Sequence, residues 1–333
     1  MTEKQTQELL DWYDANKRDL PWRHEPDAYH VWLSEIMLQQ TRVEAVKGYY
    51  ARFLAAFPTV ADLAEADDER LLKAWEGLGY YSRVRNLKKA AQVIMHEHDG
   101  IIPASPEQLL KLPGIGLYTA GAIASIVYNL PVPAVDGNVL RLLARLQADH
   151  SDIALDQTKR EFAARLLRVI PQDRPGDFNQ ALIELGACVC RPNGVPLCGI
   201  CPLQENCIAR LHSLTAELPV KSAKKPRKIA HRQLLILRFE DKLALRKRPS
   251  SGLLAGLWEL PEAFVIPSEL ILFEEHAGTA VHIFTHIEWH MMVRKITLRE
   301  ELRGECLVWI TQEELERDYA LPSAFADFRK MMF

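Results

Sequence analysis

Residues 112–119 read LPGIGLYT, and they open a stretch without charged residues that ends at Val135. Two glycines stand two positions apart, and the run AGAIASIV (120–127) behind them has the composition of a buried helix. Glycines let another backbone approach, and the first N–H groups of a helix lack partners within it. The stretch predicts a turn at Gly114 and Gly116 that binds an anion such as phosphate, although such a turn also serves structure alone.

The uncharged stretch is too interrupted to cross a membrane. Its prolines and glycines leave a helix over roughly 118–129, which is shorter than the ~20 residues that a span requires. The N-terminal MTEKQTQELL is polar and lacks the apolar core of an export signal. We therefore expect a cytoplasmic protein, nucleoid-associated if bacterial, with no membrane partner.

The bulk composition bounds the class of protein. A chain of 333 residues is too long for one ordinary core, so two or three domains are expected. The chain has 48% hydrophobic and 26% charged residues, which is typical of a globular protein. A net charge of −3 provides no general attraction to nucleic acid, so any site for a polyanion must be a local patch.

The spacing of apolar residues changes along the chain. Before residue 213 it is helical throughout; Thr59 and Asp62, for example, resemble a capping box at the start of a helical segment that closes near residue 77. The segment KSAKKPRK (221–228) has five basic residues and predicts an exposed linker. Beyond it the apolar period becomes two, which is typical of strands. We expect a mainly α half (1–212), a basic linker (213–228) and an α+β domain (229–333).

Five of the six cysteines lie between residues 188 and 207. Their clustering in a chain without an export signal favours a metal site over disulfides. The candidate ligands are Cys190, Cys198, Cys201 and Cys207. Their spacing suits zinc or an iron–sulfur cluster and does not separate the two. Cys188 and Cys306 are expected to be buried free thiols.

Glu35 has unusual neighbours for a carboxylate. It stands within WLSEIMLQQT (32–41), which is otherwise largely apolar. Burial would raise the pKa of this carboxyl group and make it a general acid at neutral pH. The residues alone also allow a position on the helix surface.

Several motifs occur together in one order. They are LPWR (20–23), SEIMLQQT (34–41), GLGYYSR (77–83), LPGIG (112–116) and VDGNV (135–139), followed by the cysteine cluster. This set closely resembles the MutY-type adenine DNA glycosylases of the helix–hairpin–helix, endonuclease III superfamily. The resemblance implies two helical subdomains with an iron–sulfur loop (188–207) and a C-terminal Nudix-like α+β domain.

The same resemblance implies a reaction with two carboxyl groups. Glu35 would protonate the departing adenine and later help to activate water. Asp136 would stabilise the oxocarbenium-like sugar or capture it briefly, as in glycoside hydrolysis. Tyr118 would position or shield the sugar, and Asn138 would be a positioning neighbour. Lyase members carry a lysine just after the hairpin; residues 117–119 read LYT, which implies a monofunctional hydrolase.

Further roles follow from the resemblance. Gln40 and Tyr80 would fill the gap left when adenine flips out of duplex DNA, and Trp22 with Arg23 would line the adenine pocket. The substrate would be double-stranded DNA with adenine opposite 8-oxoguanine or guanine, bound by a monomer. The four cysteines would hold a [4Fe–4S] cluster, although the first gap of seven residues is one longer than is usual in the family.

The C-terminal part carries shorter motifs. LLAGLWELP (253–261) resembles the Nudix-like domain of the same family. The glutamate-dense helix that binds magnesium in Nudix hydrolases has only a fragment here, LFEEHAG (272–278), so pyrophosphatase activity is not expected. Phe284, Thr285 and His286 match a Phe-Ser-His loop that inspects 8-oxoguanine, and an ordinary strand end is the alternative.

Two other functions remain as alternatives. An endonuclease III-type pyrimidine or thymine glycosylase lacks support because the hairpin has no lysine. A non-catalytic iron–sulfur DNA-binding protein would not require both Glu35 and Asp136.

Overall fold

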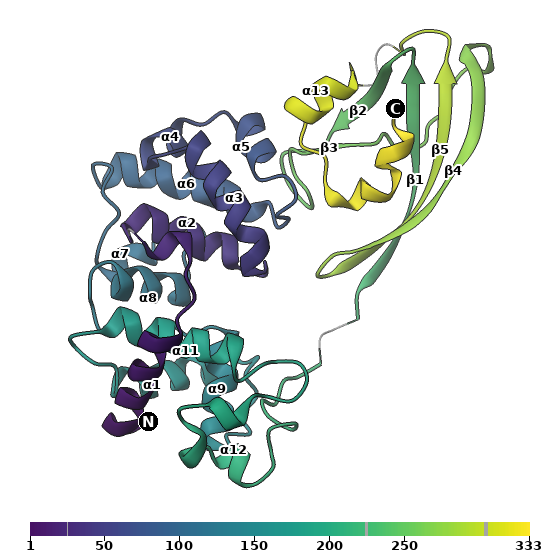
Figure 1. The fold of residues 1–333 in the computed structure, drawn as a ribbon. Coiled ribbons are helices and arrows are strands. Elements are labelled where there is room, and N and C mark those ends of the chain that lie inside the picture. The colour runs from purple at the N-terminus through teal and green to yellow at the C-terminus, as the bar shows by residue number, and fades with distance from the viewer. Residues whose placement is uncertain (25, 224–225, 303–305) are drawn as a thin grey trace. The chain divides into compact units, whose positions relative to one another are not determined.

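The computed structural model describes residues 1–24, 26–223, 226–302 and 306–333. The chain forms two compact units: residues 1–65 with 85–223, and residues 66–84 with 224–333 (Figure 1). The chain passes from one unit to the other after Ala223, inside the predicted linker; the assignment of residues 66–84 to the second unit has no counterpart in the sequence analysis. Lys224 and Lys225 of that linker lie outside the described residues.

The first unit is built of helices. They are α1 (Glu3–Asn16), η1 (Pro21–Arg23), α2 (Ala28–Leu38), α3 (Val43–Ala56), α4 (Val60–Glu65), most of α6 (Ser82–Glu97), α7 (Pro106–Leu109), α8 (Leu117–Ile126), α9 (Gly137–Gln147), α10 (Asp156–Leu167), α11 (Pro175–Cys188), η2 (Cys198–Ile200), η3 (Gln204–Asn206) and α12 (Ile208–Leu211), where η marks a 3₁₀ helix. The described elements before residue 213 are all helical, as predicted for this half of the chain.

Capping residues set where several of these helices begin. Thr59 and Asp62 bond reciprocally to each other's backbone N–H at 3.0 and 3.2 Å, as the sequence predicts for the start of α4. The helical segment expected from residue 59 onward is divided, however, because Asp67 accepts hydrogen bonds from the N–H groups of Glu69 and Arg70 and starts a new helix, α5 (Asp68–Ala74), in the second unit.

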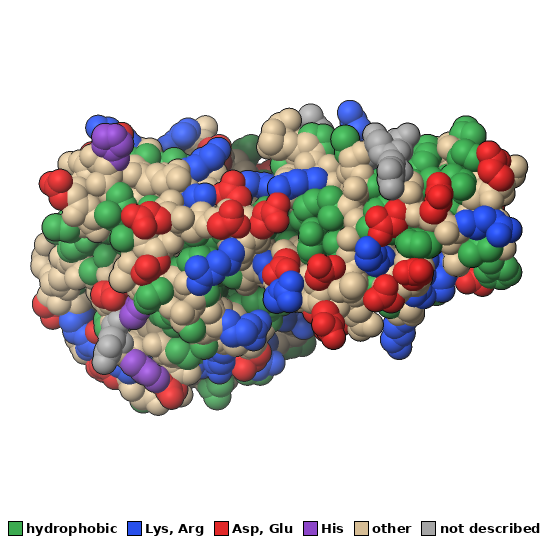
Figure 2. All heavy atoms as spheres, turned by 90° about the horizontal axis from the view of Figure 1, so that it is seen from above, with side chains coloured by type: hydrophobic (Ala, Val, Ile, Leu, Met, Phe, Trp, Pro, Cys, Tyr) green, Lys and Arg blue, Asp and Glu red, His purple; other side chains and the backbone are tan. Residues whose placement is uncertain are grey.

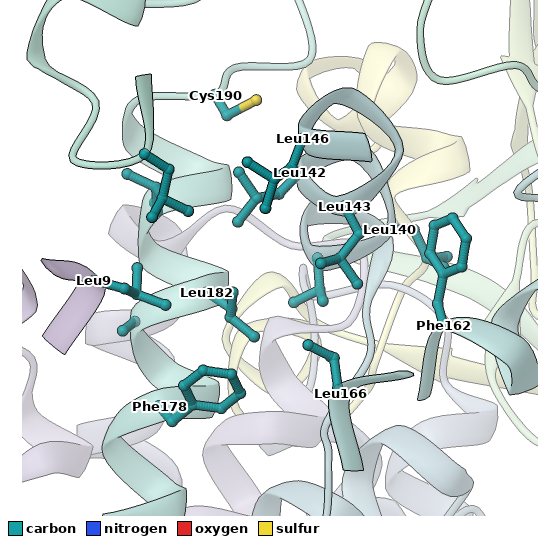
Figure 3. Packing of buried hydrophobic residues seen from close by; sticks show 14 of the residues in the cluster. Leu9, Leu140, Leu142, Leu143, Leu146, Phe162, Leu166, Phe178, Leu182 and Cys190 are labelled. Atoms are coloured by element: carbon teal, nitrogen blue, oxygen red, sulfur yellow. The ribbon is translucent and has the colours of Figure 1, made fainter. Parts of the chain in front are cut away.

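Helix α9 lies at the centre of one core. Its leucines recur at helical spacing, and Leu140, Leu143 and Leu146 are at most 5% exposed. Figure 3 shows them among side chains from α1, α10 and α11, including Leu9, Phe162, Leu166, Phe178 and Leu182. Cys190 lies at the edge of the same cluster, so the cysteine loop is anchored to the core that carries α9.

Two glycines let helices of this unit approach closely. A Cβ atom at Gly176 in α11 would lie 2.8 Å from the Ile126 Cα of α8. A Cβ atom at Gly186 would lie 2.7 Å from the Asn138 Cβ of α9. Both distances are too short for real Cβ atoms, so α11 holds α8 and α9 at backbone contact, and these two helices carry the site described below.

The second unit contains a six-stranded sheet of order β3-β2-β1-β5-β4, with β6 paired to β2. The strands are β1 (Lys228–Phe239), β2 (Lys242–Lys247), β3 (Trp258–Glu259), β4 (Ile271–Ile283), β5 (Ile287–Leu298) and β6 (Leu307–Ile310). β1 and β5 are parallel, and the other pairs are antiparallel. The remaining elements are α5, η4 (Ser268–Leu270), α13 (Gln312–Arg317) and η5 (Ser323–Met331).

One strand of this sheet occupies the place of a sequence motif. Residues 272–278, the fragment compared with a glutamate-dense helix, form part of β4, the terminal strand in the sheet order. Its pairing with β5 shifts register between His276 and Gly278, which marks an irregularity of the bulge type. On one face of the sheet, Phe325 and Phe328 of η5 pack against a core that includes Trp289.

The distribution of surface charge and the lengths of the described helices agree with the expectations from the sequence. On the face drawn in Figure 2, acidic and basic side chains are interspersed. Among the described residues, every helix is too short or too polar to traverse a lipid bilayer.

Candidate active site

A cavity of about 1160 Å³ opens in the first unit. The predicted site residues that line it are Trp22, Arg23, Glu35, Gln40, Tyr118, Asp136 and Asn138. Glu35 comes from α2, Tyr118 from the first turn of α8, and Asp136 from the residue before α9. Residues separated by more than a hundred positions thus line one cavity, and both predicted carboxyl groups are among them.

Glu35 lies on the wall of this cavity with a strongly shifted proton affinity. Burial raises its pKa to about 7, and the charge of Asp136 adds to the increase. Two influences oppose it: the Tyr118 hydroxyl donates to Glu35 Oε2 at 2.6 Å, and Arg23 contributes positive charge. At neutral pH, Glu35 is therefore divided between its acid and carboxylate forms, as suits a proton donor.

Asp136 is held as the N-cap of α9. Its Oδ1 accepts hydrogen bonds from the N–H groups of Asn138 and Val139 at 2.9 and 2.8 Å, and its Oδ2 accepts one from the Asn138 side chain at 2.7 Å. Burial raises the pKa of Asp136, whereas these donors lower it because they favour the charged form. The environment thus fixes the orientation of a carboxylate whose charge is met by three hydrogen bonds.

Asn138 is oriented in turn by Arg141. The Arg141 guanidinium donates to Asn138 Oδ1 at 3.0 Å and to the carbonyls of Gly186 and Cys190, both at 2.8 Å. The amide of Asn138 is therefore directed with its NH₂ toward Asp136. These contacts connect the end of the cavity that contains Asp136 with the start of the cysteine loop.

The sequence analysis missed part of the cavity wall. Glu184 of α11 is only 1% exposed and accepts hydrogen bonds from the guanidinium groups of Arg18 and Arg23. Arg23 also donates to Gln180 Oε1 at 3.0 Å. The paired residues are 157 to 166 positions apart, so no local sequence pattern predicts these hydrogen bonds. A glutamate within the apolar stretch of α11 is the one signal that was available.

The glycine turn is closely packed at Gly114 and open at Gly116. Gly114 has φ +80°, and a Cβ atom there would lie 2.7 Å from Asn86 Cβ. Gly116 is the N-cap of α8, no side chain caps this helix, and a Cβ atom at Gly116 would meet open space. Among the described residues, the first N–H groups of α8 therefore have no capping side chain, and such groups can bind an anion.

Gln40 and Tyr80 both have left-handed backbones. Gln40 has φ +60° and is an exposed residue of the cavity wall. Tyr80 has φ +46°, belongs to the second unit and is 47% exposed. The turn that carries it is held by Arg83, which donates to the carbonyls of Leu78 and Gly79. Each side chain is therefore presented by a constrained turn.

The four predicted ligand cysteines line one small second cavity. Burial raises the pKa of Cys201 to about 12, and the charges of the other three thiols add to the effect. The described part of the chain has no three His, Cys, Asp or Glu side chains placed to bind a single ion. The shared cavity brings the four candidate ligands together, and four thiols so placed suit zinc or an iron–sulfur cluster.

The surroundings of the cysteine cavity supply positive charge. Arg145 is buried and donates to Cys190 Sγ at 3.4 Å and to the Arg191 carbonyl at 3.0 Å. Cys188 is half-buried and is not among the lining residues. Cys306 is exposed, so the expectation that it is buried was wrong. A guanidinium beside a thiolate offsets the negative charge that four ligand cysteines would bring together.

Phe284, Thr285 and His286 form the turn between β4 and β5. The Phe284 N–H donates to the Ile287 carbonyl at 2.9 Å and closes the turn. Phe284 is half-buried, whereas Thr285 and His286 are exposed. The turn therefore presents a hydroxyl and an imidazole to solvent while its phenylalanine faces the core.

Two family matches cover both parts of the chain. Residues 33–172 match the HhH-GPD superfamily base excision DNA repair proteins, and residues 232–331 match the NUDIX domain. A thermostable thymine-DNA glycosylase of known structure covers 63% of this chain and 98% of its own, with a TM-score of 0.57 and 25% identity. Fold and site thus define a helix–hairpin–helix DNA glycosylase of base excision repair, as the resemblance predicts.

Comparison with individual relatives identifies the family within this class of DNA glycosylases. The adenine DNA glycosylase of Rattus norvegicus is 35% identical over 95% of this chain and 75% of its own length. The Homo sapiens enzyme is 35% identical over 92% and 70%, and the Arabidopsis thaliana enzyme 38% over 90% and 58%. The chain belongs to the adenine DNA glycosylase family, whose members remove adenine in base excision repair.

Proposed function

We propose that this glycosylase hydrolyses the bond between adenine and deoxyribose when adenine is mispaired with 8-oxoguanine or guanine in duplex DNA. The observation that carries the proposal is the common cavity of Glu35, Tyr118 and Asp136, in which one carboxyl group has a pKa near 7 and the other is met by three hydrogen-bond donors. The reaction requires the first group as an acid and the second as a carboxylate. Burial raises the pKa of Asp136 overall, and the three donors oppose that increase because they favour the charged form.

Glu35 acts as the general acid in this proposal. Adenine is a poor leaving group as an anion, so the proton of Glu35 passes to a ring nitrogen while the bond from the sugar carbon to the base breaks. The electron pair of that bond stays on the base. Glu35, now a carboxylate, takes a proton from the water that attacks the sugar carbon, which restores the acid and leaves an abasic site. Proton transfer of this kind contributes about 10²- to 10⁴-fold to a rate.

Asp136 balances the positive charge that develops on the sugar. Its carboxylate is oriented by Asn138 and Val139, so it need not reorganise as the bond breaks. Tyr118 donates to Glu35, which orients the acid and limits the increase of its pKa. Asn138 thus positions Asp136, and Tyr118 positions Glu35.

The scarcity of lysine around the cavity favours hydrolysis by water over a mechanism that forms a Schiff base. Residues 117–119, just after the hairpin, are Leu, Tyr and Thr. Among the described residues that line the cavity, Lys17 is the one lysine, and its ammonium lies over the Tyr13 ring, 5.4 Å from the centroid. A monofunctional glycosylase follows from these residues.

The DNA contacts are assigned to residues of both units. Gly114 supplies the left-handed turn, and Gly116 leaves the α8 N-terminus open to a backbone phosphate. Gln40 and Tyr80 fill the stack after adenine leaves it, and Trp22 with Arg23 forms the wall of the base pocket. Phe284, Thr285 and His286 inspect the base opposite the adenine. The protein acts as a monomer on its mispaired duplex.

Cys190, Cys198, Cys201 and Cys207 hold a [4Fe–4S] cluster in this proposal. The cluster cross-links a loop of short 3₁₀ turns that lacks a large core of its own. Arg145 would donate a hydrogen bond to the sulfur of one of these ligands, as it does to Cys190 Sγ at 3.4 Å.

A duplex series tests the substrate assignment. One labelled strand carries a single adenine opposite 8-oxoguanine, guanine, cytosine or thymine, and alkali-labile sites are measured under single-turnover conditions. We expect cleavage at adenine opposite 8-oxoguanine and guanine, with little opposite cytosine or thymine. Equal excision from all four duplexes would remove the mispair assignment, and excision of thymine instead would favour the pyrimidine glycosylase alternative.

A further inference from the structure

A buried carboxylate in the second unit is surrounded by arginines. Glu259 of β3 is 0% exposed and forms ion pairs with Arg232, Arg246 and Arg248, which we name the arginine cluster. A buried carboxylate without partners would be strongly unfavourable, so these guanidinium groups are what keep Glu259 charged in the interior. Arg232 is bonded further to Glu262 at 2.6 Å.

The arginines approach Glu259 from two sides. Arg246 binds Oε1 at 2.7 Å, whereas Arg232 and Arg248 both bind Oε2. The two arginines on Oε2 also lie over the ring of Trp289, with Cζ 4.2 and 5.4 Å from the ring centroid. Glu259 therefore fixes two cations against one indole, and a desolvated contact of this kind is stronger than an exposed one.

Trp289 connects the arginine cluster to the β4–β5 turn through a contact with Phe284. It is 4% exposed, and its ring meets the ring of Phe284 edge-on with centroids 4.9 Å apart. Phe284 meets His282 in the same manner at 4.6 Å. Phe284 is the one residue of the 284–286 turn whose side chain is half-buried, so its ring is the anchor of that turn. Figure 1 shows β1 and β5 in parallel, which places Arg232 and Trp289 on adjacent strands.

We propose that Arg232 and Trp289 are positioning residues that determine the opposite-base preference of the enzyme. The inference rests on the proposed role of residues 284–286 in inspecting the base opposite adenine. Arg232 holds Trp289, Trp289 holds Phe284, and Phe284 fixes the turn that exposes Thr285 and His286. A fixed turn meets the opposite base without loss of conformational entropy, and that advantage is greatest for the base it fits.

The test compares the same substitution at two arginines that pair with the Glu259 carboxylate. Arg232→Lys keeps a positive charge near Glu259 Oε2 and removes the planar group over Trp289. Arg246→Lys makes the same change at Oε1. The ratio of single-turnover excision rates for adenine opposite 8-oxoguanine and opposite cytosine is measured for the full chain, together with Kd for each duplex and the unfolding temperature. We expect Arg232→Lys to reduce the ratio about tenfold and Arg246→Lys to leave it unchanged.

Several outcomes overturn the inference. An unchanged ratio in Arg232→Lys would do so, as would an equal reduction in both variants, since the arginine cluster would then act through stability of the whole unit. Should Arg232→Lys fail to fold, Trp289→Phe serves instead: it keeps an aromatic ring with a weaker cation contact, and an unchanged ratio again contradicts the inference.

A third variant separates this inference from the function on which it rests. The double change Thr285→Ala with His286→Ala alters the exposed turn and leaves Trp289 in place. If the double variant retains the full preference, the assignment of the turn itself is wrong. If the double variant loses the preference and Arg232→Lys retains it, the turn inspects the base and only the positioning role of Arg232 fails.

Discussion

The hydroxyl of Tyr118 donates to Glu35 Oε2 across 2.6 Å. This bond joins the first turn of α8, which follows the glycine turn, to the acid on α2. The N-terminus proposed to bind phosphate and the group proposed to protonate the base are therefore two residues and one hydrogen bond apart. DNA that displaces the α8 N-terminus at Gly116 would therefore also displace Tyr118 and the Glu35 carboxyl group that protonates the adenine.

Glu35→Gln is expected to bind mispaired DNA and leave adenine in place. The amide has nearly the shape of the acid but no proton to give, so the single-turnover rate should fall about 10²- to 10⁴-fold with Kd little changed. Glu44→Gln is the matched control, because Glu44 is a mostly exposed glutamate paired with Lys47 on the next helix. Near-normal excision by the Glu35 variant would remove this residue from the mechanism.

The rate of excision should fall as the pH rises above about 7, where Glu35 loses its proton. Tyr118→Phe removes a hydrogen bond that favours the carboxylate, so the pKa of Glu35 should increase and the alkaline decline should move to higher pH. Single-turnover pH–rate profiles of both proteins measure this shift. A decline that stays in place, or moves toward acid, would contradict the role given to the Tyr118–Glu35 bond.

Gly114→Ala and Gly116→Ala should have different effects. Alanine at Gly114 must adopt a left-handed backbone and meets Asn86, so the free energy of unfolding should decrease by about 1–2 kcal/mol. Alanine at Gly116 meets open space, so stability should change by less than about 0.5 kcal/mol. Its methyl group would instead obstruct the approach of DNA and weaken Kd for every duplex. Denaturant unfolding and salt-dependent DNA titrations measure the two effects, and unchanged DNA affinity in Gly116→Ala would argue against a phosphate at this turn.

Iron content tests the cysteine assignment. Cys198→Ser should yield protein with less iron, a weaker yellow-brown colour and a lower unfolding temperature. Cys188→Ser is the control, because Cys188 lies outside the cavity lined by the other four and should not affect iron. Colourless wild-type protein with stoichiometric zinc would overturn the cluster, and iron loss in Cys188→Ser would show that the ligand set has been chosen wrongly.

Borohydride should trap little of the enzyme on mispaired DNA, since a trapped complex requires an amine that attacks the sugar. The measurement is the fraction of labelled duplex that becomes covalently bound, with Lys17→Ala as the comparison. Efficient trapping that Lys17→Ala abolishes would show that Lys17 supplies the amine, and the monofunctional assignment would then be wrong.

Local chemistry was sufficient to predict several elements. As expected, Gly114 needs its positive φ, Thr59 and Asp62 cap a helix, and the apolar period of two beyond the linker corresponds to strands such as β1 and β2. The division between α4 and α5 was missed because the apolar spacing continues through Asp67, whose competing cap at a second N-terminus is a weaker signal.

The cavity wall was predictable only in part. Glu35 and Asp136 were found through motifs that lie close to them in the sequence. Arg18 and Glu184 depend on a contact between α11 and the segment after α1, and no period or cap encodes a pairing across 166 positions. The same is true of the arginine cluster, since Glu259 looks like any strand glutamate until β1, β2 and the residue after β2 bring three cations to it.

β4 ends the sheet with thirteen residues, and its outer hydrogen-bonding groups are open to another β chain. Leu272, Phe273, Val281 and Ile283 are more than half exposed there, so such an edge invites chain-to-chain stacking. Glu274, Glu275 and the irregularity before Gly278 interrupt the flat template in its middle. Charged residues and irregular pairing at a sheet edge oppose edge-to-edge association, so we expect replacement of the two acids with valine to increase aggregation.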